Sequence, residues 1–224
     1  MLIMQILDIH THNERRQSVV SLSAVQLAAQ YQDSSGVVLE EDIAYSVGIH
    51  PWNTAADIPD AAWSMLAAVA EMPQVVAVGE AGIDKLRGGA MFRQLLTFRR
   101  HVELSERLRK PLIIHDVRAN DIIIGLHRDF KPSMPWCIHG FRGKPAVAEM
   151  FTRRGIYLSF GVGFNEQTVR AVPQEYILAE TDDADAGIES VLASLTAIRG
   201  EDMTPAVAAN SARFLGGVTQ TGRP

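Results

Sequence analysis

The sequence has very little cysteine: Cys137 is the only one among 224 residues. A single thiol excludes an intramolecular disulfide framework and is compatible with a reducing compartment, so we expect a cytoplasmic location. Long apolar runs are missing too, since no stretch approaches the roughly 20 apolar residues that cross a bilayer. The apolar start MLIMQIL has no basic flank and is too short for a signal sequence. We therefore expect a soluble protein with no membrane partner.

Positive charge is in the minority. The 21 lysines and arginines stand against 26 aspartates and glutamates, which gives a net charge of -5 and a pI near 5.8. Such a chain has no global positive field to attract nucleic acid by counterion release, so any polyanion must be bound locally. Internal repeats, low-complexity tracts and long linkers are also missing. We predict one domain over residues 1–216, followed by a C-terminal tail over residues 217–224.

What the sequence does contain is a regular alternation of two patterns. Eight short runs are rich in β-branched or apolar residues, as expected of strands buried in a parallel sheet. Their bounds are residues 3–9, 18–24, 44–50, 75–80, 111–116, 135–140, 156–162 and 176–182. Segments between them, such as residues 59–72 and 90–108, carry apolar residues at helical spacing. This alternation predicts an α/β fold, a closed (β/α)8 TIM-like barrel in a single domain.

The start of the chain departs from this template. Too few residues separate the first two runs for a full crossover helix between parallel strands. Residues 25–43 have poor helical periodicity and are interrupted by the sequence DSSG. We therefore predict a barrel that lacks its first crossover helix, and no clear helix over residues 25–43.

Two histidines, His10 and His12, stand two positions apart where the first expected strand ends. Successive side chains of a strand point to opposite faces, so these two share a face with Cα atoms about 6.5 Å apart. That separation suits the binding of one metal ion. Taken alone, the pair is equally consistent with one hydrogen-bonded core histidine and one loop histidine.

Ionisable residues recur where the other expected strands end. They are His50, Glu80, His115, His139 and Asp182. In a barrel of this type the carboxyl ends of the strands converge on one face, where active sites are built. Imidazoles and carboxylates suit Zn, Mn, Fe or Co and, at a carboxylate-rich position, Mg. The set exceeds the ligands of one tetrahedral ion and suffices for two ions bridged by a carboxylate, so the spacing predicts a metal-dependent hydrolase.

The motifs around these residues follow one another along nearly the whole chain. They are DIHTH (8–12), VGIHPW (47–52), AVGEAGID (77–84), Gln94 with Phe98, PLIIH (111–115), IHGFRG (138–143), YLSFG (157–161), LAETD (178–182) and NSARFLG (210–216). In this order they resemble the TatD-type metal-dependent deoxyribonuclease family, within the amidohydrolase-like barrels. The resemblance implies that His50 lies near the site but outside the metal shell. It implies that the metal ligands are His10, His12, Glu80, His115, His139 and Asp182.

The constellation also suggests how such a site would work. Two divalent ions, of Mg, Mn or Zn, can polarise a phosphoryl oxygen and lower the pKa of a water toward neutrality. Asp182 is the candidate to hold that water and accept its proton, and Glu80 is the candidate to bridge the ions. The resemblance implies hydrolysis of phosphodiester bonds, with a DNA end or single strand as substrate.

Basic residues on loops after the ligand-bearing strands are candidates for contacts with that substrate. Arg118 and Arg142 stand where a phosphate approaching the metals would pass, and with His50 they form our predicted substrate-binding set. The usual HSRDA of the family reads HDVRA here, which moves the arginine to Arg118, and the usual ETDAP reads ETDDA. These departures leave the implied ligands intact and bear on substrate specificity.

Two other functions stay open at this stage. The same ligand set activates water against a carbonyl carbon, so a barrel hydrolase acting on an ester, amide or lactone is the main alternative, and the acidic pI agrees with it. A non-catalytic metal-binding protein is the other, although retention of every ligand argues against it. Outside the site, we expect Cys137 to be a buried inert thiol, and His101 and His127 to be structural or solvent-facing.

Overall fold

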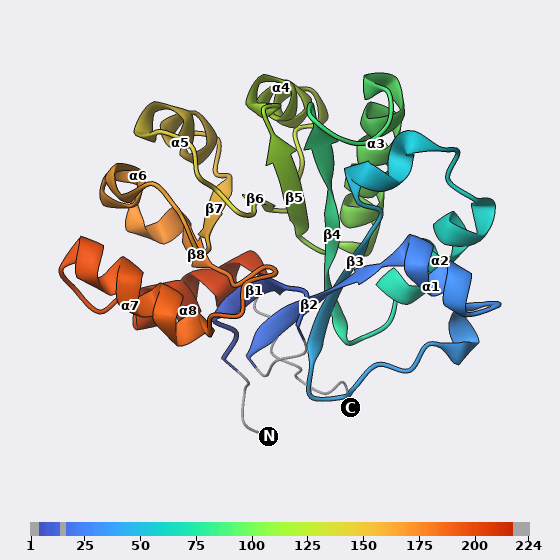
Figure 1. Ribbon diagram of the computed structural model, residues 1–224, viewed down its shortest axis with the longest axis horizontal. Helices are drawn as coiled ribbons and strands as arrows, with labels where there is room; N and C mark the ends of the chain where they lie inside the picture. The colour runs from blue at the N-terminus through green and yellow to red at the C-terminus, as the bar shows by residue number, and fades with distance from the viewer. Residues whose placement is uncertain (1–4, 14–16, 217–224) are drawn as a thin grey trace.

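The computed structural model describes residues 5–13 and 17–216, so the tail predicted over residues 217–224 lies outside the described residues. The eight strands form a closed parallel barrel in sequence order, and helices flank most of it, leaving the side of the first two strands without one (Figure 1). The strands are β1 (Asp8–Thr11), β2 (Ser18–Ser23), β3 (Ala44–Gly48), β4 (Val75–Asp84), β5 (Leu112–Val117), β6 (Trp136–Ile138), β7 (Tyr157–Phe160) and β8 (Ile177–Ala179). The predicted TIM-like barrel is therefore confirmed.

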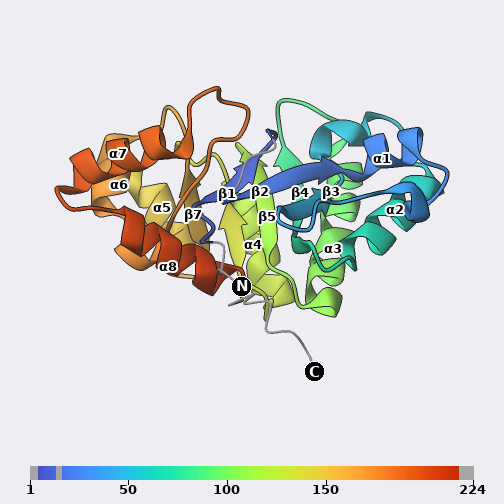
Figure 2. The same ribbon diagram turned by 90° about the horizontal axis from the view of Figure 1, so that it is seen from below.

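Helices follow the strands from β2 onward and pack on the outside of the barrel (Figures 1 and 2). The α-helices are α1 (Ala24–Gln30), α2 (Asp60–Ala70), α3 (Met91–Leu108), α4 (Asn120–Phe130), α5 (Pro145–Thr152), α6 (Glu166–Ala171), α7 (Ile188–Arg199) and α8 (Thr204–Phe214). Short 3₁₀ helices are η1 (Ser34–Gly36), η2 (Pro51–Ala55) and η3 (Gln174–Tyr176). No helix in the described part of the chain is long and apolar enough to cross a membrane.

The first two strands are joined without room for a crossover helix. Residues 12–17 are all that separate β1 from β2, and the two strands pair in parallel. The expectation for residues 25–43 was wrong in one respect, because α1 begins at Ala24. Its start is fixed by the Ser23 hydroxyl, which accepts a hydrogen bond from the Gln26 N–H at 3.4 Å. Good helix formers in AVQLAAQ then favour the helix locally, despite its weak amphipathic pattern.

The hydrophobic core has two parts, one on each side of the sheet. The larger part lies between the strands and the outer helices and includes Phe98 and Val102 of α3, on the face that the helical spacing predicted. The smaller part includes side chains from the strands, such as Ile113, together with Phe214 at the end of α8. Because both faces of the parallel sheet are covered, every residue of β4 is buried. Cys137 is fully buried as expected, and burial raises the pKa of its thiol well above the ordinary value.

His101 is a buried structural residue that ties α3 to the chain leading to His50. Its Nε2 accepts a hydrogen bond from the Ile49 N–H at 2.9 Å, and its Nδ1 donates to the Thr97 carbonyl at 2.8 Å. Complete burial lowers the pKa of His101 to about 4, although the bond to Thr97 opposes the shift. His101 is therefore neutral in the folded protein at neutral pH.

We expect this histidine to make the fold acid-sensitive. Its pKa is lower in the folded than in the unfolded chain, so the unfolded chain binds the extra proton and stability falls as the pH drops from 6.5 toward 4. Between pH 7 and pH 5 the contribution lost is about 2 kcal/mol. Urea unfolding of metal-free wild type and of His101→Asn at both pH values tests this. The wild type should lose about that much more free energy of unfolding than the variant; equal losses would contradict the assignment.

Candidate metal centre

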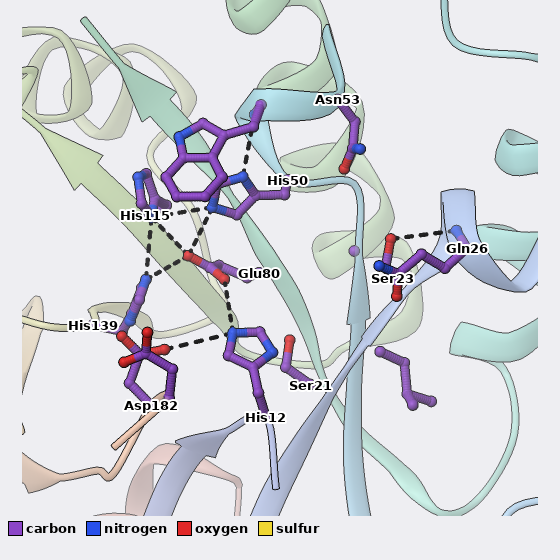
Figure 3. Close-up of a pocket in the computed structure, with 14 residues that line it drawn as sticks. His12, Ser21, Ser23, Gln26, His50, Asn53, Glu80, His115, His139 and Asp182 are labelled. Atoms are coloured by element: carbon purple, nitrogen blue, oxygen red, sulfur yellow. Dashed lines mark hydrogen bonds and ion pairs between the residues drawn. The ribbon is translucent and has the colours of Figure 1, made fainter. Parts of the chain in front are cut away.

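Glu80, on β4, stands at the centre of a cluster of histidines (Figure 3). Its Oε1 lies 2.6 Å from His139 Nε2, 2.7 Å from His115 Nδ1 and 3.2 Å from His50 Nε2. Its Oε2 lies 3.6 Å from His10 Nε2. One buried carboxylate therefore reaches imidazoles carried by β1 and β5 and by the loops after β3 and β6.

Asp182 completes the cluster from the segment after β8. Its Oδ1 lies 3.6 Å from His10 Nε2 and 3.5 Å from His12 Nε2. The backbones interlock at the same point: the Asp182 N–H donates to the His10 carbonyl, and the His12 N–H donates to the Asp182 carbonyl, each at 3.0 Å. All six residues predicted as metal ligands therefore lie together on the carboxyl-terminal side of the barrel, although β4 continues past Glu80 to Asp84, beyond the expected strand end.

Local irregularities in two strands aim these side chains. Residues 8–11 of β1 pair with residues 18–20 of β2, and residues 78–81 of β4 pair with residues 112–114 of β5. In each case the first strand of the pair, β1 or β4, has one more residue over this stretch than its partner. Such a β-bulge changes the direction of the side chains beside it. At β4 the extra residue needs Gly79, because its φ is +129° and a Cβ there would collide with the Ile113 carbonyl oxygen.

The cluster has the chemistry of a metal site. Four groups of side chains each bring their ligand atoms within 4.8 Å of one another. The groups are His10, His12 and Asp182; His10, Glu80 and His139; His50, Glu80 and His115; and His139, Glu180 and Asp182. Both ring nitrogens of the fully buried His10 lack a hydrogen-bond partner in the part of the chain that the structure describes, which is costly unless another group binds there. Nitrogen and oxygen donors in this arrangement fit divalent transition metals.

Charges within the cluster are strongly coupled. Burial disfavours the charged imidazolium of His139, yet the carboxylates of Glu80 and Glu180 raise the pKa of His139 well above its ordinary value. Burial likewise opposes ionisation of Glu80, but the His139 charge and hydrogen bonds from His115 and His139 hold the pKa of Glu80 well below the usual range. A metal cation at this point would take the place of the shared proton, since ligand histidines must be neutral.

The outer members of the cluster have the protonation states that metal binding needs. Burial and the neighbouring His10 lower the pKa of His12, which favours the neutral imidazole. The pKa of Asp182 is lowered despite burial, because the His10 ring lies 3.6 Å from its Oδ1 and His139 adds positive charge. Asp182 is only partly buried, with 34% of its side chain exposed. It therefore presents an ionised carboxylate to the open side of the cluster.

The predicted substrate-binding residues are placed differently from one another. His50 lies inside the cluster, with Nε2 also 3.3 Å from His115 Nδ1. Arg142 lines a small cavity of about 30 Å³ beside Asp182 and Asp183. Arg118 is exposed at the end of β5 and lines neither this cavity nor the larger pocket that leads to the cluster. The substrate-binding roles of these three residues stay predictions.

An open pocket of about 350 Å³ leads to the cluster (Figure 3). Its lining includes most of the cluster together with Trp52 and Asp183, and a second wall from β2, β3, α1 and η2. The residues of that second wall are Ser21, Leu22, Ser23, Gln26, Gly48 and Asn53. Among the described residues that line the pocket, none is a lysine or an arginine.

Glu180 is a residue of this site that the sequence reasoning missed. It is fully buried, its Oε1 accepts a hydrogen bond from the Gly140 N–H at 2.6 Å, and the same oxygen faces His139 Nδ1 at 3.5 Å. Its Oε2 has no hydrogen-bond partner among the described residues. Such a carboxylate behind a ligand histidine fixes the tautomer that leaves the other ring nitrogen free for metal. The sequence could have identified Glu180 as a candidate, because it stands two positions before Asp182 in the motif LAETD.

Asp84 and Trp52 form a second support that was missed. Asp84 Oδ2 accepts a hydrogen bond from Trp52 Nε1 at 2.6 Å and lies 3.4 Å from His115 Nε2. Arg87 lies over the Trp52 ring, 4.8 Å from its centroid. Asp84 is the last residue of the motif AVGEAGID, and Trp52 is the last residue of VGIHPW. Their places in these motifs were the sequence signal that could have identified both as residues of the site.

Comparison with known proteins agrees with this geometry. The family model described as TatD related DNase matches residues 8–219. A relative from Mycobacterium tuberculosis, named "Uncharacterized metal-dependent hydrolase TatD", is 33% identical over 61% of this chain and 56% of its own length. A relative from Erwinia billingiae, named "3'-5' ssDNA/RNA exonuclease TatD", is 27% identical over 61% of this chain and 56% of its own length.

Solved structures share the fold at low sequence identity. The TatD homologue YJJV from Escherichia coli superposes with a TM-score of 0.74 at 21% identity, covering 95% of this chain and 98% of its own. A TatD family hydrolase from Entamoeba histolytica superposes with a TM-score of 0.72 at 14% identity, over 94% of this chain and 98% of its own. Matches to the first three curated relatives span 44% to 61% of those proteins. Because the family model covers nearly all of the barrel, the chain belongs to the TatD related DNase family.

Proposed function

We propose that the chain is a metal-dependent hydrolase that cleaves phosphodiester bonds in nucleic acid, with a DNA end or single strand as its substrate. The observation that carries the proposal is the cluster around Glu80, where imidazoles and carboxylates meet at the carboxyl end of the barrel. The name of the Erwinia billingiae relative, an exonuclease of single-stranded DNA and RNA, supports the choice of substrate. Family membership supports the class of reaction.

The proposed metal ligands are the six residues named from the sequence. They are His10, His12, Glu80, His115, His139 and Asp182. Glu80 belongs to two of the four ligand groups, one with His10 and one with His115, which supports two ions sharing this carboxylate. When bound, divalent ions such as Mg, Mn or Zn polarise phosphoryl oxygens and lower the pKa of water toward neutrality.

The chain's own residues then position and deprotonate the attacking water. Asp182, ionised and partly exposed, is the proposed general base, with Oδ1 as the atom that accepts the proton. Glu80 is the second proposed catalytic residue, because it holds the cluster together from its buried position. Glu180 keeps the His139 ring oriented from behind. His50, Arg118 and Arg142 are the proposed substrate contacts.

One observation favours a second candidate. A pocket without lysine or arginine among its described lining residues suits a neutral substrate, so a barrel hydrolase of an ester, amide or lactone is the rival. Parallel assays of the metal-loaded chain on a single-stranded oligonucleotide, on neutral aryl esters and on lactones separate the two. Our proposal expects hydrolysis of the oligonucleotide at least 100-fold faster than of any neutral ester. A preference for the esters or lactones would favour the rival.

The domain bounds of the chain and its location in the cell are part of the proposal. We propose a single hydrolase domain over residues 1–216, with residues 217–224 as a tail, acting in the cytoplasm. The single cysteine supports a reducing compartment. Fractionation of the source cells with an antibody against the chain tests the location.

We expect DNA binding to depend only weakly on salt. With a net charge of -5 and no lysine or arginine among the described residues that line the pocket, the chain should neutralise roughly two to four phosphates rather than the six to ten typical of duplex binders. Fluorescence anisotropy of a single-stranded oligonucleotide gives the affinity at several salt concentrations. The slope of log affinity against log salt concentration then gives the number of phosphates. Arg118→Ala should weaken binding without loss of metal, whereas the exposed Arg128→Ala, far along α4, should change neither. A slope matching six or more phosphates would contradict the prediction.

A further inference from the structure

We infer that the second wall of the pocket binds the nucleoside of the nucleotide being cleaved, through neutral side chains of β2, α1 and η2. The inference rests on the proposed phosphodiesterase function and adds a recognition site to it. The side chains that carry it are Ser21, Ser23, Gln26 and Asn53, with Leu22 and Trp52 beside them.

The wall stands apart from the cluster. Figure 3 shows Ser23, Gln26 and Asn53 across the pocket from His139 and Asp182. The cavity of about 350 Å³ lies within the range of about 300–1,000 Å³ typical of small-molecule sites. A ligand whose phosphate lies at the cluster therefore has space for one further group, and that group meets the neutral wall.

The charges in the pocket decide what kind of group this is. The ionisable residues among the described lining are the cluster members and Asp183. The phosphate of a ligand would therefore lie on the cluster side, where metal ions would bind it. Among the described residues, the opposite wall presents hydroxyls, amides and apolar surface. A second phosphate would find no cation among the described lining residues, whereas an uncharged sugar and base would find hydrogen-bond partners. The pocket therefore favours one nucleoside over a run of backbone phosphates.

The polar groups of the wall are free to bind a ligand. Gln26 and Asn53 are exposed, and their side chains make no hydrogen bond to any part of the chain that the structure describes. Ser23 Oγ accepts the Gln26 N–H, which leaves its hydroxyl hydrogen available. A carboxamide offers a donor and an acceptor side by side, the pattern that matches the edge of a nucleobase.

Apolar surface beside these groups suits a ring. Leu22 lines the same wall, and Trp52 borders it with 46% of its surface exposed. The indole is held in place by its hydrogen bond to Asp84. A base that bonds to the amides would therefore lie against fixed apolar surface, as is common where proteins bind single-stranded nucleic acid.

Two chromogenic diesters with the same leaving group test this. Thymidine 5′-(4-nitrophenyl phosphate) carries a nucleoside, and methyl 4-nitrophenyl phosphate carries a methyl group in its place. For the metal-loaded full chain we expect kcat/KM to be at least tenfold higher for the nucleoside diester. The double variant Gln26→Ala/Asn53→Ala should raise KM for that diester about tenfold, with the methyl diester unaffected. Gln30→Ala, at the end of α1 with its amide bonded to Tyr31, is the matched control and should change neither.

Each result bears on the inference. Equal rates for the two diesters in the wild type, or an equal loss for both in the double variant, would overturn the nucleoside site while leaving the phosphodiesterase proposal intact. Hydrolysis of neither diester would instead count against the phosphodiesterase proposal. Saturation-transfer NMR with free thymidine then tests whether the wall binds a nucleoside, independently of any hydrolysis. A thymidine signal that the wild type gives and the double variant does not give supports the site, and no thymidine signal with the wild type overturns it.

Discussion

Replacing Asp182 with asparagine should lower the turnover of a single-stranded oligonucleotide by about 100-fold or more, the usual scale for loss of a general base. Asparagine keeps the shape and one side-chain oxygen, but it cannot accept a proton at neutral pH. The histidines and Glu80 still offer ligands, so at least one metal ion should stay bound. Initial rates together with metal analysis of the same samples measure both effects.

The control for this substitution is Asp57→Asn, which removes a carboxylate from an exposed loop position. It should leave both rate and metal content unchanged. If Asp182→Asn kept near-normal turnover with normal metal content, Asp182 would be an ordinary ligand. The base would then have to be sought elsewhere, first at His50, which contacts both Glu80 and His115.

Replacing Glu80 with glutamine should remove metal and activity together. The buried carboxylate is shared by two ligand groups, and its loss leaves the imidazole of His139 without its main counter-charge. We expect metal content to fall below one ion per chain and the rate to fall by about 1,000-fold or more, beyond the 10–100-fold typical of residues that only support a ligand. Mass spectrometry of the metals and a rate assay measure the two losses.

Glu103→Gln provides the comparison, because Glu103 is exposed on α3 and belongs to none of the ligand groups. It should retain the wild-type metal content and rate. Circular dichroism of both variants establishes that the barrel is still folded. Normal metal stoichiometry in folded Glu80→Gln would show that the shared carboxylate is not a ligand.

The ligand cluster could be predicted from the sequence because barrel topology converts strand order into spatial proximity. Four residues of the cluster are far apart in the chain, but each stands at or next to the end of a short apolar run in the sequence. They are His10, Glu80, His115 and Asp182. Once the runs are taken as parallel strands of one barrel, their carboxyl ends must meet. Strand order therefore brought the candidates to one face, His50 among them, and the resemblance to the TatD-type family then implied which six of them are ligands.

Other features of the site depend on geometry that no residue pattern fixes. The extra residues in β1 and β4 aim His10 and Glu80 into the cluster, and they are visible only in the strand register. Glu180 and Asp84 act through ring orientation and hydrogen bonds, which the motif positions hint at without specifying. Helix α1 was missed because a local cap at Ser23, rather than an amphipathic pattern, defines it. Loop residues such as Arg118 could be placed near the site only by assumption.

The central claim is that the cluster around Glu80 binds the metal ions that make this chain a phosphodiesterase. Titration of Mn²⁺ into chelator-treated protein, with hydrolysis of a single-stranded oligonucleotide followed at every step, tests it most directly. We predict saturation at two ions per chain, with activity absent at the start, rising with bound metal, and abolished again on addition of chelator. Hydrolysis that persists at full rate in the chelator-treated protein, or protein that binds no Mn²⁺, would contradict the account.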